Sequence, residues 1–227
     1  MKLLNTILFI LLTAHLFGQN LQIHYDMGDN RNYVTSTFEM FKPDEYGATF
    51  LFIDFDYNLP VTNDASLAYL EIARYLTIPF LHDIKFTVQL NDGLVIFSNP
   101  DRESFMKYAG NNIPQTWLTG ISIPLKFANL TADVLFRFPN GSDAIQNQLT
   151  FVWFKSLFHR KITLTGFYDI WTASKNDGNK QFVHLAEPQI WYNISKHLFI
   201  GSEIEISKHF ISDGITINPT IALKWNF

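Results

Sequence analysis

The feature that most constrains this chain is an alternation of apolar and polar residues that runs from Gln19 to the C-terminus. It is clearest in the last segment, where one face carries Ile215, Ile217, Pro219, Ile221, Leu223, Trp225 and Phe227. The other face carries Thr216, Asn218, Thr220, Ala222, Lys224 and Asn226. Adjacent residues of a strand point to opposite sides of the sheet. The segment is therefore expected to form a strand with one apolar wall and one polar wall.

The same pattern predicts twelve strands in all. The first ten cover residues 21–28, 31–41, 46–58, 66–78, 83–97, 113–127, 130–138, 146–157, 161–172 and 181–193. The eleventh runs from Leu198 to Ser207, and the twelfth is the final segment described above. Many exceed the average strand of a globular protein, about 5–6 residues, and reach the roughly 9–11 residues that a tilted membrane strand needs. Residues 65–81 could also be drawn as an amphipathic helix. We favour a strand there, because a helix would break the even strand count.

The links between these strands differ in length according to their order. Links after even strands are short: 42–45, 79–82, 128–129, 158–160 and 194–196. Links after odd strands are longer and polar, apart from the first one near residues 28–30: 59–64, 98–112, 139–145, 173–180 and 208–213. Outer-membrane barrels have tight periplasmic turns and longer outer loops. We therefore predict an all-β, antiparallel, up-and-down transmembrane barrel.

The N-terminus predicts export. Residues 1–18 begin Met1-Lys2, continue through an apolar run from Leu3 to Leu12 and end on a small residue, Gly18, which is typical of a secretory signal peptide. A retained anchor is the alternative, but a run of about 10 apolar residues is too short to span a bilayer as a helix. We expect the barrel to occupy residues 19–227 and to lie in the outer membrane of a Gram-negative cell.

Composition excludes several classes of function. Without Lys2 the chain has 16 basic against 21 acidic residues, a poor balance for binding nucleic acid. It has no cysteine, which rules out disulfides and thiol chemistry. Its 22 Phe, 9 Tyr and 5 Trp residues suit a barrel that can place aromatic rings toward lipid. No Gly-x-Ser-x-Gly elbow and no His-x-x-x-His spacing stands out, so we expect no catalytic residue, no metal ligand and no cofactor.

A resemblance extends this reading. Thr37-Phe38-Glu39-Met40, a turn and then Tyr46-Gly47-Ala48-Thr49-Phe50-Leu51-Phe52-Ile53-Asp54 resemble the nucleoside-specific channel-forming porins (the Tsx-like family). Ser66 to Arg74 and the closing strand resemble an uncharacterised branch related to that family. The resemblance implies a monomeric twelve-stranded barrel with a narrow pore. It also implies aromatic rings that sandwich a nucleobase and polar side chains that bind the ribose.

The candidate solute-binding residues follow from strand phase. Asp is costly in lipid and acceptable in a lumen, so Asp54 should point inward together with Phe50 and Phe52. Tyr69 and Glu71 should be their inward neighbours on the next strand, and Glu39 should complete an acidic patch. Arg137 is the expected lumenal counter-charge, with Lys161 and Lys224 behind it. The alternative is that these rings fill the inside of a small barrel and these charges tie its wall together.

We therefore expect a channel for passive uptake of small polar solutes, with nucleosides the leading class. Two alternatives remain open: a non-conducting structural or receptor barrel, and an outer-membrane lipid-modifying enzyme. The expected partners are outer-membrane lipid and lipopolysaccharide, together with the barrel-assembly machinery, which would recognise the C-terminal Phe227.

Overall fold

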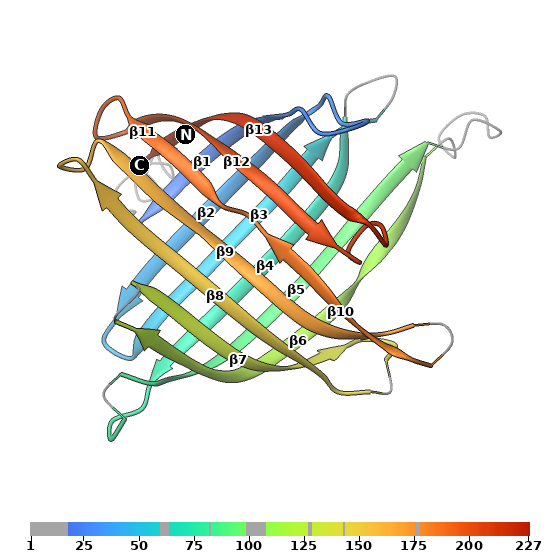
Figure 1. Ribbon diagram of the computed structural model, residues 1–227, viewed down its shortest axis with the longest axis horizontal. Coiled ribbons are helices and arrows are strands. Elements are labelled where there is room, and N and C mark those ends of the chain that lie inside the picture. The colour runs from blue at the N-terminus through green and yellow to red at the C-terminus, as the bar shows by residue number, and fades with distance from the viewer. Residues whose placement is uncertain are drawn as a thin grey trace, which may run out of the picture.

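The chain forms a single closed antiparallel β-barrel (Figure 1). The computed structural model describes residues 18–59, 64–81, 83–98, 108–126, 129–142, 144–175 and 178–227. The signal peptide predicted for residues 1–18 lies outside the described residues, apart from Gly18. No helix within the described ranges is long and apolar enough to cross a membrane.

Thirteen strand segments are present. They are β1 (Gln19–Asp26), β2 (Val34–Asp44), β3 (Gly47–Tyr57), β4 (Ala65–Thr77), β5 (Lys85–Ser98), β6 (Tyr108–Leu125), β7 (Leu130–Pro139), β8 (Gln146–Leu157), β9 (Ile162–Ser174), β10 (Lys180–Ala186), β11 (Gln189–Asn193), β12 (Leu198–Lys208) and β13 (Ile215–Asn226). Neighbours in sequence pair in order, and β1 pairs with β13 to close the ring.

β10 and β11 are two halves of one strand, because both pair with β9 on one side and with β12 on the other. The predicted twelve-stranded barrel is therefore confirmed. The predicted strand 181–193 is wrong in being continuous: it is interrupted at Glu187 and Pro188. Proline has no N–H to donate to the ladder. On β9, a Cβ added to Gly166 (φ +146°) would lie 2.4 Å from the Glu187 carbonyl oxygen, so only glycine lets the interrupted strand pass so closely.

The observed strand bounds test two other predictions, the strand at residues 65–81 and the long link at 98–112. Residues 65–81 contain β4, so the strand assignment is confirmed and the helix is excluded. The predicted link 98–112 is shorter than expected, because β5 reaches Ser98 and β6 already begins at Tyr108. The remainder of that link, 99–107, lies outside the described residues.

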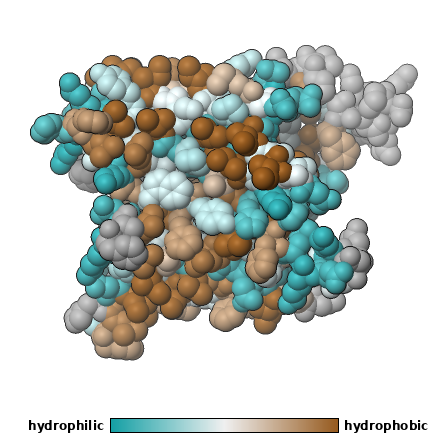
Figure 2. Space-filling model, in the orientation of Figure 1, coloured by the Kyte–Doolittle hydropathy of each residue, from teal (hydrophilic) through white to brown (hydrophobic). Residues whose placement is uncertain are grey.

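The barrel has an apolar outer wall and a polar inner wall, as β13 illustrates. Its outward Ile217, Ile221 and Trp225 are 59%, 51% and 47% exposed, whereas the inward Asn218 and Thr220 are 6% and 7% exposed. Figure 2 shows hydrophobic side chains across the middle of the near wall, with more hydrophilic residues toward both ends. Such a wall is suited to lipid.

The two ends of the barrel differ. In Figure 1 β1 begins and β13 ends on the left, and the turns between β2 and β3, β8 and β9, and β11 and β12 lie on the same side; β3 ends and β4 begins at the opposite, right-hand end. The strand bounds match the predicted difference in link length at most links, but the link from β4 to β5 covers 78–84 instead of 79–82, and the first link covers 27–33 instead of 28–30. By analogy with outer-membrane barrels, the left end is the periplasmic end and the right end is the outer mouth.

Candidate functional site

The candidate site is the barrel lumen, and contacts between distant strands identify the residues that face it. Tyr75 on β4 donates a hydrogen bond of 3.0 Å to the carboxylate of Asp133 on β7. His24 on β1 meets the ring of Trp191 on β11 edge-on, with 6.0 Å between the ring centroids. These pairs are not on adjacent strands, so their side chains must cross the interior.

Six of the seven predicted solute-binding residues lie together on three adjacent strands, β2, β3 and β4. One lateral row contains Glu39, Phe52 and Glu71, which are successive register partners. The next row toward the outer mouth pairs Asp54 with Tyr69, and the next row toward the periplasm contains Phe50. We call Glu39, Phe50, Phe52, Asp54, Tyr69 and Glu71 the β2–β4 patch.

The aromatic rings of the patch contact one another. The ring centroids of Phe50 and Phe52 are 6.0 Å apart, with 54° between the ring planes, and Phe52 and Tyr69 have the same separation and angle. Such tilted packing is a favourable aromatic geometry. The rings therefore form a continuous surface, but they are not parallel plates between which a base could be sandwiched without movement.

The carboxylates of the patch are held by neutral donors. Asp54 accepts a hydrogen bond of 2.5 Å from Thr37. Glu71 accepts 2.6 Å hydrogen bonds from Tyr69 and from the Asn91 amide. Glu39 accepts one of 3.0 Å from the Asn20 amide. None of the three forms an ion pair with a cation in the described part of the chain.

The predicted counter-charges Arg137 and Lys224 are near enough to interact electrostatically with Glu71 and Glu39, but neither forms a direct ion pair with them. Arg137, on β7, donates a 3.1 Å hydrogen bond to Gln148 and stacks over the ring of Trp171, 4.7 Å from its centroid. Lys224 is lumenal and lies 3.9 Å from the centroid of Trp191. The prediction for Lys161 is wrong, because this residue lies exposed in the turn between β8 and β9.

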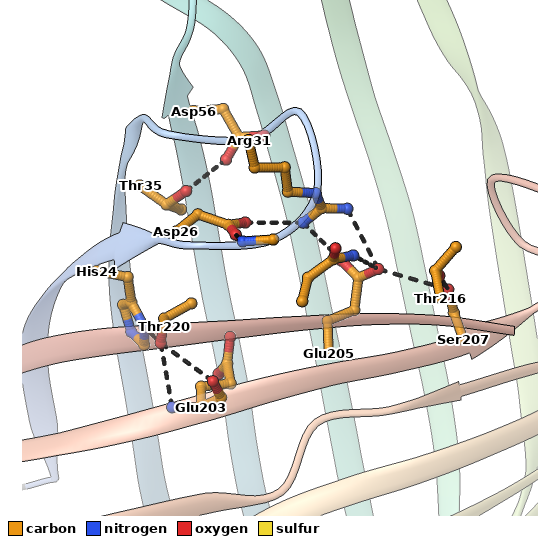
Figure 3. Close-up of polar contacts among 12 residues, drawn as sticks. His24, Asp26, Arg31, Thr35, Asp56, Glu203, Glu205, Ser207, Thr216 and Thr220 are labelled. Carbon is orange, nitrogen blue, oxygen red and sulfur yellow. Dashed lines mark hydrogen bonds and ion pairs between the residues drawn. The ribbon is translucent and has the colours of Figure 1, made fainter.

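The outer mouth contains a network that the sequence analysis missed, which we call the Arg31 network: Asp26, Arg31 and Glu205 (Figure 3). Arg31 comes from the connection between β1 and β2, where a strand had been predicted. Its guanidinium donates to Asp26 at 2.9 Å and to both carboxylate oxygens of Glu205 at 3.1 and 3.2 Å. It thereby joins β1 to β12 across β13.

Further contacts hold this network in place. The Gly28 amide donates to Asp26 at 2.8 Å, and the Asn218 side chain donates to Glu205 at 3.0 Å. A Cβ added to Gly28 would lie 2.2 Å from the Asn218 Oδ1, so glycine lets the connection lie against β13. A local sequence signal was present, since Asp26 at the end of β1 and Arg31 flank the short polar link near Gly28. Their partner on β12 is 174 positions away from Arg31 and cannot be read from local pattern.

Electrostatics in the connection agree with this geometry. Burial disfavours the charged form of Arg31, but the hydrogen bond to Asp26 and the charge of Glu205 outweigh it and raise the pKa of Arg31. Burial, together with the negative charge of Asp56, raises the pKa of the Tyr33 phenol. At neutral pH Arg31 is therefore charged and Tyr33 is neutral.

A third cluster lies in the lumen toward the periplasmic ends of β11, β12 and β13. Trp191 is completely buried and donates a 2.9 Å hydrogen bond to Gln189. Its ring packs against Gly201 on β12, where an added Cβ would come within 2.5 Å of it. Phe199 and Ala222 complete an apolar cluster with Trp191. No group of side chains in the described residues could hold a metal ion.

Comparisons with solved structures found similar barrels. A solved NanC porin has 7% identity and a TM-score of 0.55, over 92% of this chain and 100% of that chain. A KdgM porin in complex with disordered oligogalacturonate has 9% identity and a TM-score of 0.46, over 92% and 98% of the two chains. The outer membrane protein Omp33 of Acinetobacter baumannii has 9% identity and a TM-score of 0.48, over 92% and 96%.

The similarity to NanC shows a shared outer-membrane barrel fold. A search of curated proteins found no match. The family described as "Domain of unknown function (DUF5020)" matches residues 18–227, nearly the whole chain, and the protein therefore belongs to that family.

Proposed function

We propose that the protein is an outer-membrane channel for passive uptake of small polar solutes, with nucleosides as the preferred class. The observation that carries the proposal is the β2–β4 patch, in which the contacting rings of Phe50, Phe52 and Tyr69 lie beside the carboxylates of Asp54 and Glu71. Aromatic rings offer a face for a nucleobase, and carboxylates accept hydrogen bonds from ribose hydroxyls.

The energies suit a channel. Stacking of a base on an aromatic side chain contributes about 1–3 kcal/mol. A conducting pore needs sites strong enough to attract the solute and weak enough to release it. A single stacking surface with a few hydrogen bonds meets both needs. The absence of ion pairs within the described part of the patch leaves its carboxylates free to exchange a neutral donor such as Thr37 for a solute hydroxyl.

The test is single-channel conductance of the refolded mature barrel in a planar bilayer, titrated with adenosine or uridine and with glucose as a control. Nucleoside should block the current at micromolar to millimolar concentration, and Phe52→Ala should weaken the block by at least about fivefold, from the lower end of the stacking energy. The matched control is Phe55→Ala on the same strand. Phe55 faces outward and is 37% exposed, so its removal should leave the block unchanged.

Two results would count against the proposal in different ways. Conductance that nucleosides do not block would reject the nucleoside class and leave a general channel. A correctly folded, heat-modifiable barrel with no conductance would reject transport altogether.

A second candidate function, a non-conducting structural or receptor barrel, is favoured by the third cluster. Trp191 is 0% exposed, and the Lys224 ammonium lies between the rings of Trp191 and Phe199, 3.9 and 5.7 Å from their centroids. These side chains occupy lumen that a solute would need. If wild type is silent and Trp191→Ala conducts, the cluster is the obstruction and the second candidate gains support.

A further inference from the structure

The outward wall carries a groove that the proposed channel does not use. It has a volume of about 320 Å³ and lies where β9, β10, β12 and β13 are adjacent. Its floor is Ala186, whose register partners are Tyr168 on β9 and Ile206 on β12. The small alanine between two larger outward side chains leaves the wall hollow at this point. β9, β10 and β12 belong to the wall that faces the viewer in Figure 1.

Polar groups border this groove although the face is turned toward lipid. The Tyr168 hydroxyl and the His184 Nδ1 are 2.7 Å apart, and their rings stack with 6.1 Å between centroids. Phe151 stacks on the other side of Tyr168, at 6.4 Å. Polar side chains on a lipid-facing wall are costly. Stacking fixes the hydrogen-bonded pair in position, and its contact uses only one ring nitrogen of His184, which leaves the second nitrogen for a polar partner in the membrane.

The Lys208 side chain lies beside the Tyr168–His184 pair. Lys208 on β12 is the register partner of His184 on β10, so both side chains leave the same face of the sheet side by side. When the Tyr168 hydroxyl donates to Nδ1, the His184 proton resides on Nε2, which can then donate outward. The imidazole N–H and the ammonium together offer an anion two donors of the charge-assisted kind.

The position of the groove in the membrane identifies the anion. Lys208 is the last residue of β12 and pairs with Ile215, the first residue of β13, so the polar edge lies at the outer-mouth end of both strands. The apolar floor, Ala186 and Ile206, continues toward the membrane interior. A ligand with a phosphate at the surface and an acyl chain below it fits this order of polar and apolar groups.

We propose that this groove binds the lipid A part of lipopolysaccharide, with a phosphate on His184 and Lys208 and an acyl chain over Ala186 and Ile206. The proposal depends on insertion in the outer membrane and does not depend on conduction, so it can fail while the channel proposal stands, and the reverse also holds.

The test is lipid binding by native mass spectrometry of the barrel in detergent, with bisphosphorylated lipid A, the same lipid A after removal of both phosphates, and phosphatidylglycerol. Wild type should retain bisphosphorylated lipid A in preference to the other two. His184→Ala and Lys208→Ala should each weaken retention about tenfold, the scale of one charge-assisted hydrogen bond. Each variant is first checked for heat-modifiable migration, and His184→Asn replaces His184→Ala if the alanine variant does not fold.

The matched control is Lys180→Ala. Lys180 leaves the same face of β10 as His184, four residues nearer the outer mouth, and its register partner is Ser174 rather than a groove residue. It should change retention less than twofold. Equal losses from Lys180→Ala and Lys208→Ala would mean general attraction of cations to an anionic lipid and would overturn the site. Equal retention of dephosphorylated lipid A or of phosphatidylglycerol would also overturn it.

Discussion

The outer mouth and the β2–β4 patch both contain carboxylates, but these carboxylates have different kinds of hydrogen-bond donor. At the mouth, Asp26 and Glu205 share the guanidinium of Arg31 in ion pairs of 2.9 and 3.1 Å. In the patch, Asp54 and Glu71 are bound by hydroxyls and an amide. Carboxylates that share a cation join strands through ion pairs, whereas carboxylates bound only by neutral donors have no cation in direct contact. We therefore expect the Arg31 network to stabilise the closed barrel and the β2–β4 patch to contact solutes.

The largest expected effect is on the free energy of unfolding, when the Arg31 network is removed. Arg31→Ala leaves two largely buried carboxylates without their cation, since the side chains of Asp26 and Glu205 are only 6% and 15% exposed. Removing one partner of such a network destabilises a protein by roughly 3 kcal/mol. Urea unfolding in lipid vesicles, followed by tryptophan fluorescence, should show this loss. Arg31→Lys should recover part of it; an unchanged midpoint for Arg31→Ala would remove the closing role.

A smaller effect on stability is expected in the patch. Thr37→Val deletes the hydroxyl that donates to Asp54. Loss of one hydrogen bond to a carboxylate should cost about 1–2 kcal/mol in the same unfolding experiment. Thr37→Ser keeps the hydroxyl and should behave like wild type. A loss as large as that of Arg31→Ala would show that the patch too is mainly a structural tie.

The smallest expected effect is on ion selectivity, and it tests most directly the difference between the carboxylates of the mouth and those of the patch. If the pore conducts, the reversal potential in a potassium chloride gradient reports cation preference. Asp54→Asn should lower the cation-to-anion permeability ratio by about twofold, because it removes an unpaired lumenal charge. The double variant Asp26→Asn with Arg31→Gln removes one charge of each sign and should leave the ratio unchanged. Equal shifts in the two variants would contradict the division between paired and unpaired carboxylates.

Most of the fold was predictable because a barrel wall is a local property. Each strand between lipid and lumen must alternate, so residues 66–78 were recognisable as a strand even though they also fit a helical pattern. The grouping of Glu39, Asp54 and Glu71 followed from strand phase and from the up-and-down order, which makes successive strands neighbours. The interruption of the tenth strand at Pro188 was missed, although proline is a poor strand residue, and the close approach to Gly166 at this point requires the register of β9.

The rest could not be predicted, because it depends on which residues meet across the ring. Arg31 reaches Glu205 only after the first and last strands have paired. Lys224 lies over Trp191 because the register from Trp191 through Gly201 to Ala222 brings β11 and β13 to the same level. Lys161 was predicted to face the lumen only because it alternates with the apolar residues of its strand. Alternation does not show where a strand begins, and Lys161 lies in the turn before β9.

Closure between β1 and β13 has a consequence for the order of assembly. The β2–β4 patch is built from three successive hairpin-connected strands between Val34 and Thr77, whereas the Arg31 network joins residues 174 positions apart. Contacts distant in sequence form late, because the entropy of closing a long loop must be overcome first. A chain halted before β12 would already hold every strand of the patch, yet its mouth would not exist. The Arg31 network at the outer mouth can therefore form only when pairing of β1 with β13 closes the barrel.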